Sequence, residues 1–351
     1  MKYLLSLLLA AVVGGLATAQ PAQATPESQA AVLLLLIEPG ARAIGMGETY
    51  VAIADDATAS YFNPAALAGQ SGKSVNFTHS KWLPELADDM AYEFLAYSQP
   101  VEGWGNMGLN IAYLDFGSQQ RTGEGGEDLG SFDSFDVAIS GAYGTQISNN
   151  MSAGIGLKYI RSSLSPDFGA GQERGKGVGS SFATDLGLMW DISPVVTFGA
   201  ALRNLGPKIA YIDASQADPL PQHIVAGLAF KALDTEFNDV LLSCDVYKPL
   251  IADGSFASNL VTAWADESLS DEFSEMDLHV GGEYKYGLSA RQDESFLAMR
   301  GGYSLDTDGD LRLLTVGVGL KYNMFQVDVA YLIGDETPVN NNTRCSLNLM
   351  F

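Results

Sequence analysis

The chain holds few residues whose types and spacing favour catalysis. Its three histidines, His79, His223 and His279, each lie in or beside a segment with strand periodicity, and no pair has metal-ligand spacing. No local Ser/His/Asp motif is visible. Because a catalytic triad is assembled in space, a hydrolase built on His79 or His279 is kept as a minor alternative. We predict that the protein is not an enzyme and needs no metal or cofactor.

Three loop-like stretches resemble ligand sites only in part. Asp306–Asp310 repeats aspartate as a calcium loop does, but Gly309 stands fourth where the EF-hand pattern needs glycine at the sixth position. A polar hairpin loop is the better interpretation. The glycines at 123–126 and 169–171 are not followed by a helix, so phosphate binding is not supported.

The most specific polar residues lie in a segment rich in small residues, 38–68. Such a segment is poor at forming its own core and suited to packing inside a larger structure. An arginine inside a polar lumen needs a carboxylate partner, so Arg42 with Asp55 and Asp56 could fix the segment against a surrounding wall, as a lock or a gate. The alternative, of equal weight, is that these groups satisfy turns and helix starts. The candidate residues are Gly40, Arg42, Gly45, Met46, Gly47, Asp55, Asp56, Asn63, Pro64 and Ala65.

The elements that must position this segment are strands. Thr343–Phe351 alternates polar with apolar residues at period two and stops on an aromatic, and a terminal strand needs a partner strand. About fourteen segments have this period, most of them about 9–12 residues long, the length that a tilted strand needs to cross a bilayer. They lie near 74–82, 90–98, 105–116, 132–146, 151–163, 180–191, 195–203, 221–231, 238–247, 275–286, 295–304, 312–322, 324–333 and 343–351.

The connections between these segments alternate between long and short. Outer-membrane barrels have an even strand number, short periplasmic turns and long outer loops, which places both termini in the periplasm. By count the long connections hold about 20 acidic and about 6 basic residues. The competing interpretation, a soluble β-sandwich, predicts shorter strands and gives no reason for aromatic residues near strand ends. These aromatic residues are Tyr97, Trp104, Tyr143, Tyr159, Trp190, Tyr247, Tyr284, Tyr322 and Tyr331.

Composition and the N-terminus agree with an exported membrane protein. Net charge is −23, from 19 basic and 42 acidic residues, which excludes nucleic acid as a partner. Residues 1–24 are typical of a signal peptide, because the apolar run is shorter than the roughly 20 residues of a spanning helix. The two cysteines, Cys244 and Cys345, lie in separate strand-like segments and predict no disulfide framework.

The predicted fold is therefore all-β. It is a transmembrane antiparallel barrel of about fourteen strands over 73–351, with a plug or hatch over 25–72 in its lumen. Eight strands fill with their own side chains and sixteen leave an aqueous channel, so fourteen strands would leak without a plug.

The plug segment resembles the PorV/PorQ family of outer-membrane proteins, and more widely the FadL-like barrels. The resemblance rests on Gly40–Ala43, Gly45–Gly47, Val51–Ala57 and Phe62–Ala65. It implies a component of the type IX secretion system that binds secreted cargo, through C-terminal sorting domains, or partners of the attachment complex at the cell surface. The alternative that it implies is a FadL-like channel for the uptake of hydrophobic small molecules.

Overall fold

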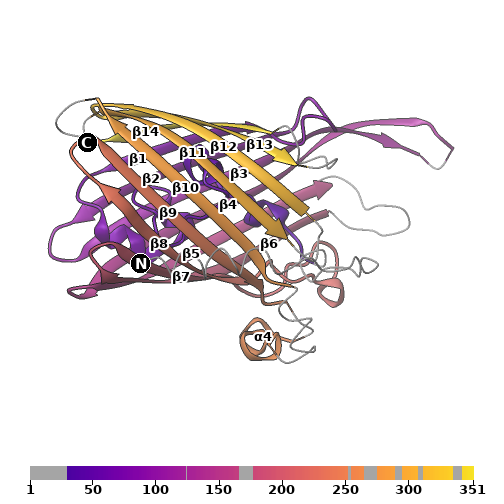
Figure 1. The fold of residues 1–351 in the computed structure, drawn as a ribbon. Helices are drawn as coiled ribbons and strands as arrows, with labels where there is room; N and C mark the ends of the chain where they lie inside the picture. The colour runs from indigo at the N-terminus through magenta and orange to yellow at the C-terminus, as the bar shows by residue number, and fades with distance from the viewer. Residues whose placement is uncertain are drawn as a thin grey trace, which may run out of the picture.

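The computed structural model describes residues 30–123, 125–165, 177–251, 254–264, 275–288, 295–306, 311–334 and 342–351. They form one closed barrel of fourteen antiparallel strands, in which each strand pairs with the next and β1 pairs with β14 (Figure 1). The predicted fold class is thus confirmed. The predicted signal peptide, 1–24, and the tail of the calcium-like loop, 307–310, lie outside the described residues.

Every strand predicted from periodicity has a counterpart in the barrel. The strands are β1 Ser74–Lys81, β2 Ala91–Val101, β3 Gly105–Thr122, β4 Asp128–Ser148, β5 Met151–Ser165, β6 Gly177–Ser193, β7 Val196–Leu205, β8 His223–Asp234, β9 Asn238–Pro249, β10 Asp277–Gly287, β11 Ser295–Asp306, β12 Leu311–Tyr322, β13 Phe325–Gly334 and β14 Thr343–Met350.

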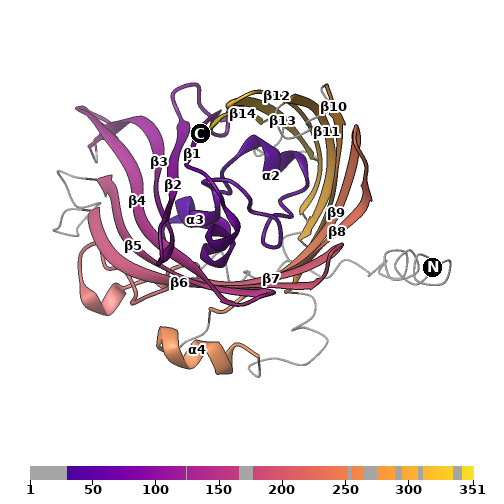
Figure 2. The ribbon, with the colours of Figure 1, turned by 90° about the vertical axis from the view of Figure 1, so that its left-hand side faces the viewer.

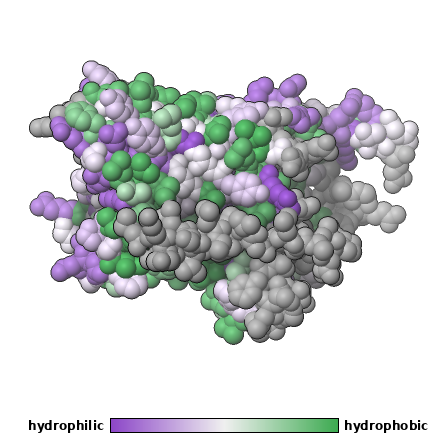
Figure 3. Space-filling model, viewed as in Figure 1, coloured by the Kyte–Doolittle hydropathy of each residue, from purple (hydrophilic) through white to green (hydrophobic). Residues whose placement is uncertain are grey.

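Period two places apolar side chains outside and polar or small ones inside. On β13, Val327 and Val329 are exposed on the outer face, whereas Gln326 and Asp328 are buried in the lumen. The terminal strand follows the same rule, and the backbone of Phe351 closes the barrel by exchanging hydrogen bonds with Lys73. Hydrophobic side chains cover much of the strand surface in Figure 3, as the hydrocarbon band of a bilayer requires.

Two details differ from the prediction. β3 continues beyond 116 to Thr122, and β4 begins at Asp128, before 132. Most of the loop expected between these two strands is therefore a two-stranded ribbon that projects beyond the other strands (Figure 1). Polar side chains in a water-exposed ribbon need not alternate with apolar ones, which hides it from a periodicity search. The length alternation also fails at one place, because the connection 288–294 is longer than 307–310.

Aromatic side chains gather at the ends of the outer surface, with one exception. Trp104, Trp190 and Tyr322 are exposed at the short-turn end, as in an aromatic girdle. Tyr247 was expected in that group but points into the lumen, where its hydroxyl donates to Glu38 Oε1 at 2.6 Å. The reason is parity, since Tyr247 is two and four residues from the inward-facing Asp245 and Ser243.

The described chain ahead of β1, residues 30–73, lies inside the ring of strands (Figure 2). Its elements are η2 Leu33–Leu36, α2 Ala41–Gly45, α3 Ala59–Phe62 and η3 Pro64–Gly69. A further short helix, α4 Phe256–Thr262, lies outside the ring. None of the helices in the described part of the chain is long and apolar enough to cross a membrane.

The described plug runs from one end of the barrel to the other. Ala31 donates to the carbonyl of Pro219 in the long connection 206–222, whereas Lys73 lies at the short-turn end beside Phe351. The C-terminus therefore shares the short-turn end with the beginning of β1. The location of both termini in the periplasm stays a prediction, and Met1 lies outside the described residues.

Candidate functional site

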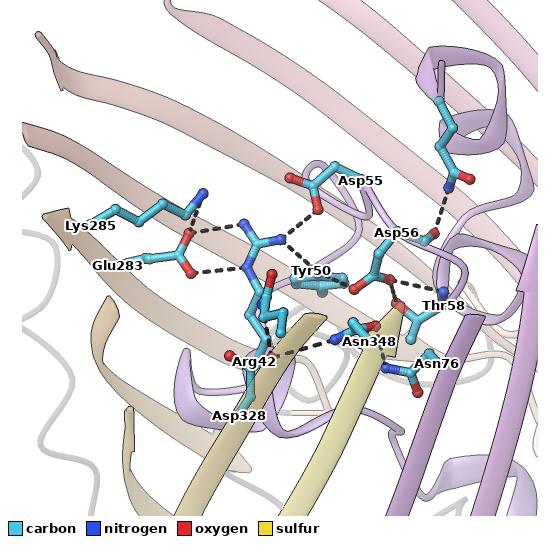
Figure 4. A network of polar contacts seen from close by, with 12 residues as sticks. Arg42, Tyr50, Asp55, Asp56, Thr58, Asn76, Glu283, Lys285, Asp328 and Asn348 are labelled. Atoms are coloured by element: carbon cyan, nitrogen blue, oxygen red, sulfur yellow. Dashed lines mark hydrogen bonds and ion pairs between the residues drawn. The ribbon is translucent and has the colours of Figure 1, made fainter. Parts of the chain in front are cut away.

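Arg42 joins the plug to the barrel wall. It lies on α2, which contacts β11, β12, β13 and β14. Its Nε and Nη2 donate to Glu283 Oε2 and Oε1 on β10, each at 2.9 Å, as a bidentate pair (Figure 4). Its Nη1 donates to Asp55 Oδ1 at 2.5 Å and to the Tyr50 hydroxyl at 3.0 Å. The guanidinium thus holds together two parts of the plug and the wall.

Glu283 is the centre of a larger buried network. Its Oε2 accepts from Arg300 Nε at 2.7 Å, and its Oε1 lies 3.1 Å from Lys285 Nζ. Arg300 Nη1 in turn donates to Asp328 Oδ1 at 2.8 Å on β13. A buried carboxylate with several cationic partners is stable only while all of them stay in place, because each group alone would carry a large desolvation cost.

The two aspartates of the motif have different roles. The Asp55 side chain is 55% exposed and pairs with Arg42. Burial raises the pKa of Asp55, but Arg42 and then Lys285 outweigh it and lower the pKa below its ordinary value. Asp56 does not contact Arg42; its Oδ1 accepts from Thr58 N at 2.9 Å, and burial followed by the charge of Asp55 raises its pKa. Asp56 therefore satisfies a turn, which was the alternative interpretation.

Gly47 and its neighbours bring the plug backbone against the wall. Gly47 has φ +67° and donates to Thr315 Oγ1 at 2.9 Å, and a Cβ there would lie 2.6 Å from the backbone nitrogen of Tyr303. Only glycine fits both the conformation and the contact. Two further plug amides, of Tyr50 and Val51, donate to Asp245 Oδ2 at 2.7 and 3.0 Å. Met46, which precedes Gly47, is fully buried.

Asn63 organises the opposite side of the plug. Asn63 precedes a short helix, η3, and its Oδ1 accepts from Ala65 N at 3.1 Å. Its Nδ2 donates to the carbonyls of Val51 at 2.9 Å and of Leu188 on β6 at 3.1 Å. One amide side chain therefore starts the helix, joins two plug segments and contacts the wall.

A second polar cluster was not found from the sequence. Glu38 is buried, its carbonyl accepts from Arg344 Nη1, and its Oε1 lies 3.9 Å from Arg203 Nη1. Arg203 stacks over the Tyr61 ring with its Cζ 4.1 Å from the centroid. Burial, and then the charge of Glu48, raise the pKa of Glu38 well above its ordinary value. In the sequence, Arg203 and Arg344 are isolated residues on separate predicted strands, and no local pattern connects them to Glu38.

Apolar packing fills the half of the lumen that faces β2–β6. Leu34, Leu35 and Phe62 pack with Phe94 of β2 and Ile160 of β5, and all of them are buried. Tyr61 contacts Phe62 and Phe94 edge to face, with ring centroids 5.2 and 5.9 Å apart. This side of the plug is a small hydrophobic core.

The plug leaves a cavity of about 880 Å³ at the short-turn end. Asn150 and Pro194 of two short connections line it, together with Arg42 and Asp55 of the plug. The lining mixes charged and apolar side chains, so the cavity suits water and polar groups as well as apolar ones.

The histidines have structural contacts. His79 pairs with Glu93 at 2.7 Å on the outer face, and His279 Nδ1 lies 3.0 Å from the Gly47 carbonyl, to which it donates. His223 Nδ1 lies 3.0 Å from the Pro221 carbonyl. Within the described ranges no cluster of three or more His, Cys, Asp or Glu side chains has the arrangement of a metal site.

A closed fourteen-stranded barrel with an apolar outer surface and an N-terminal plug defines a transmembrane β-barrel protein. The model of the family described as "Type IX secretion system protein PorV" matches residues 20–255, about two thirds of the sequence. The chain belongs to this family. Comparison with curated protein sequences gave no match.

Solved structures share the architecture at low sequence identity. The Pseudomonas putida toluene transporter TodX is 13% identical with a TM-score of 0.52, over 89% of this chain and 96% of that one. The Ralstonia pickettii toluene transporter TbuX is 14% identical with a TM-score of 0.52, over 89% and 98%. At this identity the likeness defines the fold.

Proposed function

We propose that the protein acts in type IX secretion by binding secreted cargo, or partners of the attachment complex, at the long-connection end of the barrel. The PorV family match is the observation that carries this proposal. In this proposal residues 1–24 are an export signal and the short turns face the periplasm, which places the long connections at the cell surface.

Charge supports the choice of surface. The long connections carry about 20 acidic and about 6 basic residues, so they would steer and orient a basic partner surface. Asp88, Glu127 and Asp213 are exposed representatives on three different connections. A partner that docks there would meet carboxylates from several hairpins at once.

The plug supports a binding role over a conduit for protein. It contacts the wall on both sides through Arg42 and through Asn63, and folded or extended cargo would have to displace all of these contacts to pass. We propose that the Arg42–Glu283 pair holds the plug closed, so that the barrel presents its long connections to cargo that crosses the membrane elsewhere.

The test is deletion of the gene with an assay of cargo export and surface attachment. Complementation with the wild-type chain is compared with two matched charge variants. One neutralises Asp88, Glu127 and Asp213; the other neutralises three exposed acidic residues at the short turns, Glu102, Asp234 and Glu236. We expect loss of export on deletion, rescue by the short-turn variant and weaker rescue by the long-connection variant. Normal export after deletion would contradict the proposal.

A second candidate is a channel for hydrophobic small molecules. The apolar cluster around Leu34 and Leu35 in the lumen favours it, as does the likeness to two structures titled as toluene transporters. The mixed polar lining of the cavity at the short-turn end argues against it. Uptake of toluene or a long-chain fatty acid, compared between deletion and wild-type cells, separates the two candidates.

A further inference from the structure

Helix α4 has an apolar arc that faces away from the protein. Ser255 caps it by accepting from Ser258 N at 3.3 Å. At the helical period its apolar residues share one arc, while Ser258, Asn259 and Thr262 lie on the other side. The apolar arc consists of Phe256, Ala257, Leu260, Val261 and, in the turn that follows, Trp264.

The side of α4 that packs against the protein is not its apolar arc. Asn259 and Ala263 are buried, with 4% and 3% exposure. Val261 is 73% exposed, and Phe256 and Trp264 are each 45% exposed. Large apolar side chains gathered on one exposed arc indicate an apolar environment that covers them.

The orientation of α4 fits the plane of a membrane. Figure 1 shows the helix end-on, and Figure 2, turned by 90°, shows it from the side and outside the ring beside β6 and β7. Its axis is therefore roughly perpendicular to the barrel axis. Gln222, the residue before β8, donates from Nε2 to the Phe256 carbonyl at 3.1 Å, which fixes the helix at the level where the strands end.

Lipid is the occupant that these observations favour. The barrel strand β6, beside which the helix lies, has an apolar outer face, with Phe182 65% and Leu186 43% exposed. Residues 254–264 carry no charge, so nothing in this stretch selects a charged protein surface. We propose that α4 is an interfacial helix that places Phe256, Val261 and Trp264 into the boundary between headgroups and acyl chains of the outer leaflet.

The experiment compares how deeply two positions of the same helix lie in the membrane. In a Cys244→Ala, Cys345→Ala background, Val261→Cys on the apolar arc or Ser258→Cys on the polar arc carries a fluorescent label. The barrel is folded into phosphatidylcholine vesicles whose acyl chains bear bromine atoms near the headgroup. We expect the label at 261 to be quenched at least about twofold more than the label at 258, and aqueous iodide to show the opposite order.

Equal quenching at the two positions, with equal access to iodide, would overturn the proposal. A label at 261 that stays open to iodide in vesicles and is shielded only when cargo is added would also overturn it, and would assign the arc to a protein partner. Circular dichroism and heat-dependent gel migration of each labelled variant show that the barrel is folded before its quenching is compared.

Discussion

Toward β10–β14 the plug is held by a buried ion-pair network in addition to close backbone packing at Gly47, whereas toward β3–β6 it is held by close packing and hydrogen bonds. On the first side Arg42, Glu283 and Arg300 form a buried ion-pair network, with α2 against β11–β14. On the second side η3 contacts β3–β6, and Pro64 and Ala65 lie directly against Gly154 and Gly187. Ion pairs depend on all partners being present, while packing depends on shape. The two sides should therefore fail in different ways when residues are changed.

Glu283→Ala is expected to have the largest effect, because it leaves Arg42 and Arg300 buried without their shared carboxylate. Breaking one partner of a buried network costs about 3–5 kcal/mol in the free energy of unfolding. Urea titration of the barrel folded in vesicles measures this. The control is Glu236→Ala, which removes an exposed carboxylate at a short turn and should cost less than about 1 kcal/mol. Equal losses in both variants would remove the distinction between buried and exposed charges.

Gly154→Ala tests the packed side. A Cβ at Gly154 would lie 2.3 Å from Pro64 C and 2.4 Å from Ala65 N, and these backbone atoms cannot move without η3. Overpacking of this kind costs about 1–3 kcal/mol, and we expect the upper end together with faster protease cleavage of the plug. Gly141→Ala on β4 is the matched control, since its nearest neighbour is Leu109 Cδ2 at 3.6 Å. Unchanged cleavage in Gly154→Ala would show that η3 is not seated on the wall.

Asn63 adds hydrogen bonds to the packed side, so its substitutions separate hydrogen bonding from packing there. Asn63→Ala removes the helix cap and both donated hydrogen bonds, and we expect a loss of about 2 kcal/mol. Asn63→Ser keeps an acceptor for Ala65 N and should recover part of the loss. The same urea titration measures both variants. Identical values for the two substitutions would mean that the cap contributes nothing.

Asp55→Asn is expected to have the smallest effect. The Asp55 side chain is half exposed, so its pair with Arg42 should contribute less than about 1 kcal/mol. Because the pKa of Asp55 is lowered in the folded protein, its contribution is present above the ordinary carboxyl pKa and is lost as pH falls through the lowered value. Wild type and variant should therefore differ at neutral pH and converge in acid when unfolding is measured at both. A difference that grows in acid would contradict this assignment.

Local patterns in the sequence determined the strands, the barrel and the start of η3. The alternation of polar and apolar residues depends only on the direction of successive side chains in a strand. Asn63–Pro64 favours the start of a helix in the residues that follow it directly. The family motif likewise predicted that Arg42 lies in the lumen, where a buried arginine needs a carboxylate partner. What the motif could not supply was the partner: the nearby Asp55 binds one nitrogen, but the bidentate partner is Glu283 on β10.

Only the closed barrel decided the remaining contacts, because it brings together residues that no local pattern connects. Glu283 is 241 residues from Arg42, and Arg344 reaches the Glu38 carbonyl across 306 residues. Tyr247 faces the lumen because register fixes which alternate residues point inward, and β3 and β4 pair beyond the barrel because their polar backbones bond to each other without an apolar face. These outcomes depend on strand register and on where the plug descends through the lumen, which are properties of the assembled fold.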